Sequence, residues 1–162
     1  MTNIYIYIYI YIYIYICGAL LYGISDKNIE KLQRVQNNSA RVVLKAPRQT
    51  PTEQMLSILH WLPIEHSIPY KIAVRTYKLV RTVQPEYLSE LLHHHAPVRQ
   101  KRLDVKDLLV VSTMRTKIGS RAFSHSTPSV WNSLQENLKE KNSINCFKCE
   151  LKTHLFRSAY DC

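Results

Sequence analysis

Residues 4–16 alternate strictly between isoleucine and tyrosine, and this repeat restricts the chain's conformation more narrowly than any other feature. A period of two fits a β-strand, with Ile on one face and Tyr on the other. An uncharged run of this kind, free of proline, is prone to aggregate unless it is paired or covered. Because ATA encodes Ile and TAT encodes Tyr, a run of alternating A and T is read as this repeat. We therefore interpret residues 1–16 as a low-complexity segment derived from a DNA microsatellite.

The same end of the chain also admits a membrane-anchor interpretation. Residues 2–25 contain no charged side chain, and about 20 apolar residues are enough to cross a bilayer. Lys27, Lys31 and Arg34 follow, which would be cytoplasmic by the positive-inside rule. Against this, tyrosine prefers the membrane interface, and no basic n-region or small-residue cleavage site of a secretory signal is present. A single-pass membrane-anchored basic domain remains as an alternative.

The rest of the chain has the composition of one ordinary domain with a large positive charge. Its 162 residues include 46% hydrophobic side chains and give a formal charge of +10, which favours polyanionic partners such as RNA or DNA. Four cysteines are too few for a disulfide scaffold and are ordinary in a reducing compartment, so we expect an intracellular rather than a secreted protein. Three glycines leave no glycine-rich phosphate-binding loop.

The clearest helix is predicted over residues 27–45, with Ser25 or Asp26 as its N-cap. At helical spacing its buried face would carry Ile29, Leu32, Gln36, Ser39, Ala40 and Val43. The opposite face carries five cations: Lys27, Lys31, Arg34, Arg41 and Lys45. Two interpretations stay open, a solvated face and a surface that follows a phosphate backbone for roughly 30 Å, where a polyanion would relieve the repulsion between the cations.

A second basic stripe is predicted on a helix that runs to about residue 83. Proline interrupts a helix, so Pro69 places the regular part of this helix after Ser67 or Ile68. The core-facing residues would be Ala73, Tyr77 and Val80, and the basic stripe would be Lys71, Arg75 and Lys78.

Two short helices are predicted beside these. Thr50 and Glu53 form a capping-box pattern with Pro51 at the first helical position. The helix that follows would place Met55, Leu56 and Leu59 in the core. The other short helix opens at Pro85 and runs through residue 92.

The C-terminal third is predicted to mix strands and helices. Residues 108–112 and 121–126 read as the strands of a small β-hairpin, with Gly119 in the turn. Pro128 opens a helix that holds Val130, Trp131, Leu134 and Leu138, and a last helix after Ser143 carries an apolar stripe of Ile144, Phe147, Leu151 and Leu155.

The fold class predicted from these patterns is mainly α: a bundle of amphipathic helices with the small hairpin, preceded by the Ile-Tyr segment. Four segments follow in order: the repeat at 1–16, a helical segment at 17–92, a basic linker at 93–107 and an α+β segment at 108–162. The linker includes His93, His94 and His95, which we expect at the surface because three adjacent side chains cannot all bind one tetrahedral ion.

Catalytic chemistry is mostly absent from the sequence. Asp104 and Asp107 are the nearest approach to a carboxylate pair for Mg²⁺, and they lack a third acid. His125 and Ser126 are adjacent but match no nucleophile–base signature. We therefore expect no catalytic residues, no cofactor and no enzyme activity.

One constellation has metal-ligand spacing: Cys146, Cys149, His154 and Cys162. Thiolate and imidazole ligands suit zinc, and a CCHC-like nucleic-acid-binding module is a further alternative. The fourth ligand lies too far along the chain, and a compact knuckle excludes the helix predicted here, so no metal site is assigned.

Several strings of the sequence occur together in one order. They are CGALLYG at 17–23, LQRVQNNSAR at 32–41, LHWLPIE at 59–65, YKIA and TYK within 70–78, PEYL at 85–88, RTKIGSRAFSHSTPSVWNSL at 115–134 and LKTHLF at 151–156. In order and approximate spacing they resemble the C-terminal region of the reverse-transcriptase polyprotein of jockey-type non-LTR (LINE) retrotransposons, over residues 17–162.

The resemblance implies a helical, thumb-like region downstream of the polymerase, one that helps to hold template and primer and has no catalytic residues. The family's paired-Asp polymerase signature and its endonuclease are not in this chain, so the resemblance predicts loss of activity. It also implies two partners, an RNA or DNA backbone and the upstream polymerase domain that is missing here. The candidate nucleic-acid-binding residues are Lys27, Lys31, Arg34, Arg41, Lys45, Lys71, Arg75 and Lys78.

Three positions depart from the family's pattern. Pro69 and Cys149 stand where polar or basic residues are usual, and Gln135 stands where Pro usually follows WNSL. A single CG-to-TG change converts an Arg codon to Cys, which would explain Cys149 without any metal. The sequence therefore also favours a decayed relic, and a product with no function at all is a third hypothesis beside nucleic-acid binding and membrane anchoring.

Overall fold

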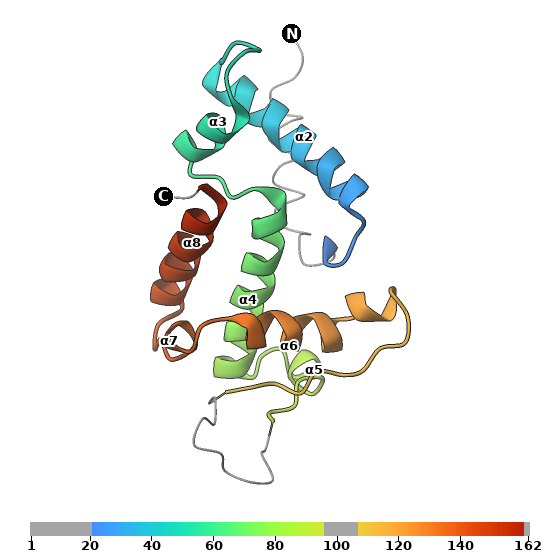
Figure 1. Cartoon of the computed structure of the whole chain (residues 1–162). Helices are drawn as coiled ribbons and strands as arrows, with labels where there is room; N and C mark the ends of the chain where they lie inside the picture. The colour runs from blue at the N-terminus through green and yellow to red at the C-terminus, as the bar shows by residue number, and fades with distance from the viewer. Residues whose placement is uncertain (1–20, 96–106, 161–162) are drawn as a thin grey trace. The chain divides into compact units, whose positions relative to one another are not determined.

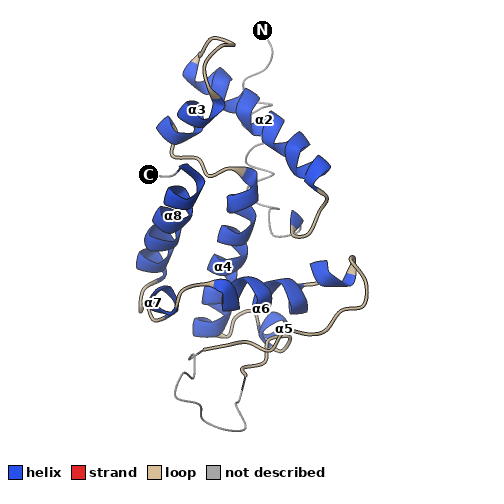
Figure 2. Ribbon diagram, viewed as in Figure 1, coloured by secondary structure: helices blue, strands red, loops and turns tan. Residues whose placement is uncertain are grey.

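The computed structural model describes residues 21–95 and 107–160, and this part of the chain is helical without any strand (Figures 1 and 2). The predicted fold class, mainly α, is confirmed. The Ile-Tyr segment, most of the basic linker, Asp104 and Cys162 lie outside the described residues. The elements are α2 (Asp26–Leu44), α3 (Thr52–Ile58), α4 (Ile64–Thr82), α5 (Glu86–Ser89), the 3-10 helix η2 (Gly119–Arg121), α6 (Phe123–Ser133), α7 (Glu136–Lys139) and α8 (Ile144–Tyr160).

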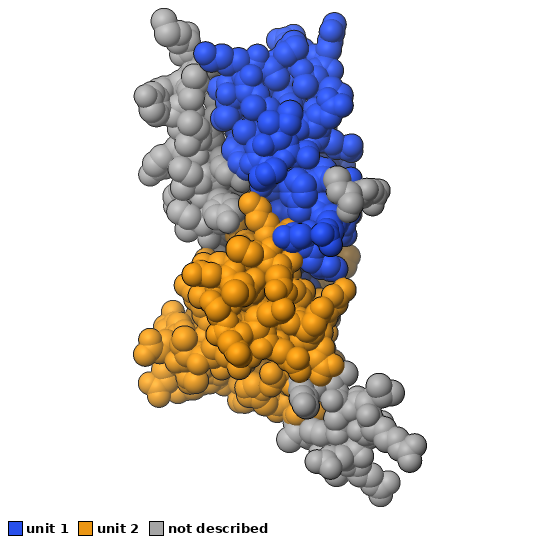
Figure 3. All heavy atoms as spheres, turned by 90° about the vertical axis from the view of Figure 1, so that its left-hand side faces the viewer, with its two compact units in different colours: residues 1–69, 153–162 blue, residues 70–152 orange. Residues whose placement is uncertain are grey.

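The chain divides into two compact units (Figure 3). Unit 1 comprises residues 1–69 and 153–162, and unit 2 comprises residues 70–152. The helices α4 and α8 each contribute residues to both units.

Unit 1 is built around the predicted apolar faces of α2 and α3. Ala40, Met55 and Leu56 form a buried cluster, and the partly buried residues packed against it are Leu44, Ala46, Leu59, Trp61 and Tyr160. The Tyr160 hydroxyl donates to the Trp61 carbonyl at 2.7 Å. The buried face of α2 is confirmed for Gln36, Ser39 and Ala40, whereas Val43 is 43% exposed.

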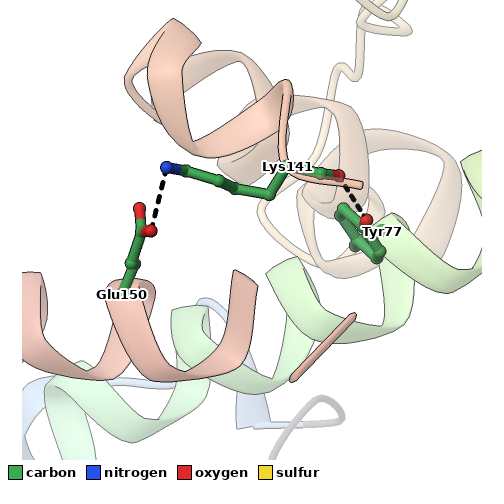
Figure 4. Close-up of polar contacts among 3 residues, drawn as sticks. All are labelled: Tyr77, Lys141 and Glu150. Carbon is green, nitrogen blue, oxygen red and sulfur yellow. Dashed lines mark hydrogen bonds and ion pairs between the residues drawn. The ribbon is translucent and has the colours of Figure 1, made fainter. Parts of the chain in front are cut away.

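Unit 2 is centred on three aromatic rings. Phe147 of α8 is fully buried, stacks on Tyr77 of α4 with ring centres 4.4 Å apart, and lies 6.2 Å from Trp131 of α6. The Tyr77 hydroxyl donates to the Lys141 carbonyl, and the Lys141 ammonium pairs with Glu150 at 2.8 Å (Figure 4). The predicted core residues Tyr77, Phe147 and Leu151 are thus confirmed.

Two helices begin earlier than predicted, and each contains a proline. α4 starts at Ile64 and carries Pro69 inside it, because the Ile64 N–H is capped by the Gln33 side chain at 2.9 Å. α6 starts at Phe123 and carries Pro128 inside it. Pro128 has no N–H for the carbonyl four residues before it, and the Ser112 hydroxyl lies 3.4 Å from that carbonyl of Ser124 as a replacement donor.

The predicted β-hairpin is wrong. Residues 123–126 belong to α6, and in the described residues the 108–112 segment forms only one isolated bridge, between Leu109 and His94. Side chains of α6 bind this segment instead of a second strand. Asn132 accepts from the Leu109 N–H at 3.0 Å and donates to the Leu109 carbonyl at 2.8 Å, and the Trp131 indole donates to the Asp107 carbonyl at 2.8 Å.

The capping box before α3 is also not formed. α3 starts at Thr52 with Pro51 as its N-cap, one residue later than predicted, and the cap makes no side-chain hydrogen bond. The helices expected after Pro85 and Ser143 do form, as α5 and α8. Leu138, expected on the helix after Pro128, lies instead on the separate α7.

Candidate nucleic-acid interface

The basic face of α2 is formed as predicted and is largely exposed. Lys27, Lys31, Arg34 and Lys45 are exposed, and Arg41 is half-buried. The residues that are buried from the same helix, Gln36, Ser39 and Ala40, point the other way. Eighteen residues separate the first and last cations, a rise of about 27 Å along the helix.

Buried amides fix the orientation of this face within unit 1. Gln36 is 1% exposed and donates to the Leu62 carbonyl at 2.8 Å. Gln33 donates to the side-chain oxygens of Gln36 and Asn37, each at 2.9 Å, and accepts from the Ile64 N–H. Because α2 is tied to the turn before α4 by hydrogen bonds rather than by apolar contact alone, its rotation about its own axis is set and the cations stay outward.

These amides were missed as positioning residues. Sequence reasoning placed Gln36 on the buried face without giving it a partner. The available signal was the spacing of Gln33, Gln36 and Asn37 at i, i+3 and i+4, which allows side-chain amides to bond along one side of a helix.

The cations of α2 are not neutralised by strong ion pairs. The ion pair of Arg34 is with Glu30, four residues earlier, at 4.0 Å, and both side chains are more than 60% exposed, so solvent screens it. Arg41 differs from the others, because its Nη2 lies 3.4 Å from the Thr50 carbonyl and its Nε is buried without a hydrogen-bond partner. Arg41 thus packs against the loop before α3 and is less accessible to a phosphate.

The C-terminal end of α2 fixes the backbone conformation of Lys45. The N–H of Ala46 donates to the Arg41 carbonyl at 3.0 Å and that of Lys45 to the Val42 carbonyl at 3.3 Å, which is a Schellman motif. Lys45 holds the left-handed conformation of this motif, with φ of 49°. Glycine usually fills this position, so a lysine here trades some helix-end stability for a charge.

The second basic stripe is only partly exposed. Arg75 and Lys78 of α4 are exposed, but Lys71 is 8% exposed and therefore does not lie on an open surface. The heptad spacing correctly puts the three on one side of α4, but neighbouring residues cover the first of them. All three residues belong to unit 2, whereas α2 belongs to unit 1.

The three described residues with zinc-ligand spacing lie along one continuous helix, and Cys162 is outside the described residues. Cys146, Cys149 and His154 are all exposed on α8. Eight helical residues correspond to a rise of about 12 Å, so Cys146 and His154 cannot bind one tetrahedral ion. Within residues 21–95 and 107–160, no three His, Cys, Asp or Glu side chains are grouped to hold a metal.

The remaining candidates for chemistry have structural partners or open surroundings. His125 lies with Nδ1 2.7 Å from the Ser112 carbonyl, and Ser126 is buried, so the pair does not form a nucleophile and its base. His93, His94 and His95 are exposed, as expected.

Lys139 is buried although sequence reasoning gave it no role. It is 1% exposed, its Nζ has no hydrogen-bond partner in the described residues, and this nitrogen lies 5.9 Å from the centre of the Trp131 ring. Burial lowers the pKa of Lys139 below its ordinary value of 10.5, and the carboxylates of Glu136 and Asp107 oppose the shift. No pattern in the sequence distinguishes this lysine from a surface one.

In the described part of the chain, no helix combines the length and apolar character that a membrane crossing needs. The uncharged run at 2–25 falls mostly outside that part, so the anchor interpretation gains no support. No known protein family, curated protein or solved structure matches the chain. The resemblance to jockey-type reverse transcriptases thus stays a prediction from the sequence.

Proposed function

We propose that the chain is a non-catalytic fragment derived from the C-terminal region of a retrotransposon reverse transcriptase, and that the basic face of α2 binds the backbone of RNA or DNA. The observation that carries the binding proposal is the set of exposed cations Lys27, Lys31 and Arg34 on one face of α2, with the exposed Lys45 directly after the end of that helix. Exposed cations of this kind can contact backbone phosphates without base contacts, so binding would be independent of sequence.

The test is the salt dependence of oligonucleotide binding by the full chain. Fluorescence anisotropy with a labelled single-stranded oligonucleotide should give an affinity that falls about 50-fold between about 50 and 200 mM salt if four phosphates are contacted. The variant Lys27→Gln/Lys31→Gln/Arg34→Gln should reduce the slope of log K against log salt by about 2. An unchanged slope would refute the α2 surface.

A matched control removes the same charge elsewhere. Lys117, Lys152 and Arg157 are exposed cations that do not belong to α2, and replacing all three by Gln lowers the net charge equally. If this control loses as much of the slope as the α2 variant, binding reflects overall charge and not a surface on α2.

The proposed origin has its own test, in genomic DNA and full-length transcripts across the 5′ side of the Ile-Tyr repeat. An interrupted polymerase reading frame directly upstream would support a retrotransposon relic. An unrelated upstream sequence would contradict it, whatever the chain binds.

A further inference from the structure

Unit 2 exposes apolar side chains in the segment that runs from the end of α4 through α5. Val83, Tyr87 and Leu91 are 59%, 68% and 46% exposed. They fall within nine residues of chain, whereas scattered single exposures are the ordinary pattern on a protein surface. A cluster of this kind marks a surface that another molecule covers.

A cavity lies in the same region and is confined to unit 2. Its volume is about 350 Å³, at the lower end of the range for ligand-binding clefts. Apolar residues of α4 and the following segments form much of the wall, and polar groups of α5 complete it. The lining residues are Leu79, Val80, Val83, Glu86, Ser89, Glu90, Leu92 and His94.

The wall next to the cavity is fixed by hydrogen bonds. The His95 N–H donates to the Leu108 carbonyl and the Val110 N–H to the His93 carbonyl, each at 2.8 Å. Leu109 lies between Leu108 and Val110 in the sequence, and the Asn132 side chain of α6 binds both its N–H and its carbonyl. The segment that carries His94 is thus connected to a core helix, and the cavity is preformed.

Val83 is held in an unfavourable conformation at the cavity. Its φ is 55°, in the left-handed region that a β-branched residue rarely adopts, and its N–H closes α4 by donating to the Leu79 carbonyl at 2.9 Å. Glycine would fit the backbone better but would remove the apolar side chain from the lining.

The charged side chains of the described cavity lining are acidic, opposite in sign to the net charge of the chain. Glu86 and Glu90 are exposed on one side of α5, four residues apart, and neither forms an ion pair with a described residue. The described residues that line the cavity include no lysine or arginine, although the chain has 22 of them. A nucleic acid would be repelled here, and a cationic partner would be attracted.

From these observations we propose that this cavity is a groove that binds a cationic amphipathic peptide segment of another protein. Its apolar side chains fill the cavity against Val80, Val83 and Leu92, while its Lys or Arg side chains pair with Glu86 and Glu90. Tyr87 and Leu91, which follow the lining residues Glu86 and Glu90 directly in sequence, are exposed apolar side chains outside the cavity, and this favours a peptide over a small molecule. This site is independent of the α2 surface, which lies in unit 1.

The test uses the full chain and a labelled model peptide made only of Leu and Lys, arranged so that Leu covers one helical face. Anisotropy should detect binding, and a scrambled peptide of the same composition should bind weakly. Glu86→Gln/Glu90→Gln should weaken binding about five- to tenfold. Glu53→Gln/Glu65→Gln removes two exposed carboxylates from unit 1 and should leave the affinity unchanged.

A second variant separates binding from folding. Val83→Gly relieves the strained backbone, so it should raise the melting temperature while it weakens peptide binding about fivefold. Loss of binding in a variant that is more stable cannot come from unfolding.

Three results would overturn the proposal. They are no binding of the amphipathic peptide, equal weakening by the unit 1 control, and full affinity in both Val83→Gly and Glu86→Gln/Glu90→Gln. A concentration-dependent dimer that only the groove variants dissociate would assign the groove to a second copy of this chain and would equally overturn it.

Discussion

Two polar side chains, one in each unit, are buried to the same degree but differ in their hydrogen-bond partners. In unit 1, Gln36 is 1% exposed, yet its amide donates to Leu62 and accepts from Gln33. In unit 2, Lys139 is also 1% exposed, but its ammonium has no hydrogen-bond partner among the described residues and lies 5.9 Å from the centre of the Trp131 ring. The partner rather than the burial decides whether a buried polar group stabilises the fold. Replacing Gln36 or Lys139 by an apolar residue should therefore have opposite effects on the free energy of unfolding.

The largest effect is expected in the aromatic centre of unit 2. Phe147→Ala removes a fully buried ring that contacts both Tyr77 and Trp131, and should lower the free energy of unfolding by about 3–5 kcal/mol. Urea unfolding followed by the fluorescence of Trp131, in a Trp61→Phe background, measures it. A loss below about 1 kcal/mol would mean that this cluster is not the core of unit 2.

The next effect tests the satisfied amide of unit 1. Gln36→Leu removes the hydrogen bond to the buried Leu62 carbonyl and the one from the Gln33 amide. It should lower the free energy of unfolding by about 1–3 kcal/mol. Asn38→Ala, at an exposed position of the same helix, is the control and should change it by less than about 0.5 kcal/mol. If the Gln36→Leu protein is as stable as the parent, the amide network does not hold α2.

The unsatisfied lysine of unit 2 should respond in the opposite direction. Lys139→Met keeps the length of the side chain and removes the buried charge, and should stabilise the protein by about 1 kcal/mol at neutral pH. Part of the gain is offset by losing the contact with the Trp131 ring. A destabilised variant would contradict the contrast between the units.

The pH dependence of that gain follows from the lowered pKa of Lys139. The unfolded chain holds the proton more tightly than the folded chain, so the parent protein gains stability as pH rises from the folded-state pKa towards 10.5. The advantage of Lys139→Met should therefore shrink over the same window. Melting curves of both proteins from neutral to alkaline pH measure the difference, and a constant difference would mean that the amine does not titrate with folding.

The smallest effect concerns the end of α2. Lys45→Gly relieves a left-handed backbone and should stabilise the protein by about 0.5–1 kcal/mol, while it reduces the salt slope of oligonucleotide binding by less than one unit. Lys31→Gly removes a cation from the helix interior instead and should destabilise by about 1 kcal/mol. Equal effects on stability would contradict the Schellman end.

The helices whose apolar residues recur most regularly at helical spacing were predictable, because neighbouring elements cover one side of each. α2, α4 and α8 have their apolar stripes where the spacing places them, at Ala40, Tyr77 and Phe147 for example. The starts of α4 and α6 were not predictable, since proline indicates a boundary only while no distant group replaces the missing hydrogen bond or caps the helix earlier. Gln33 and Ser112 are such groups, and they act across 31 and 12 residues of sequence.

The predicted hairpin failed for a related reason. Residues 108–112 have the apolar character of a strand, but their backbone is bound by the side chains of Asn132 and His125 and by the backbone of residues 93–95, not by residues 121–126. At the candidate interface, the charged face of α2 followed from spacing alone. The burial of Lys71 and the contact of Arg41 with Thr50 depend on tertiary packing that spacing does not contain.

The central claim, that the exposed cations of α2 contact a nucleic-acid backbone, is tested most directly by a lysine footprint. The full chain is acetylated briefly with and without a single-stranded oligonucleotide, and the modification of each lysine is measured by mass spectrometry. We predict protection of Lys27, Lys31 and Lys45 at low salt, lost at high salt, with Lys117 and Lys152 unchanged. Equal protection of all five lysines, or protection of none on α2, would contradict the account.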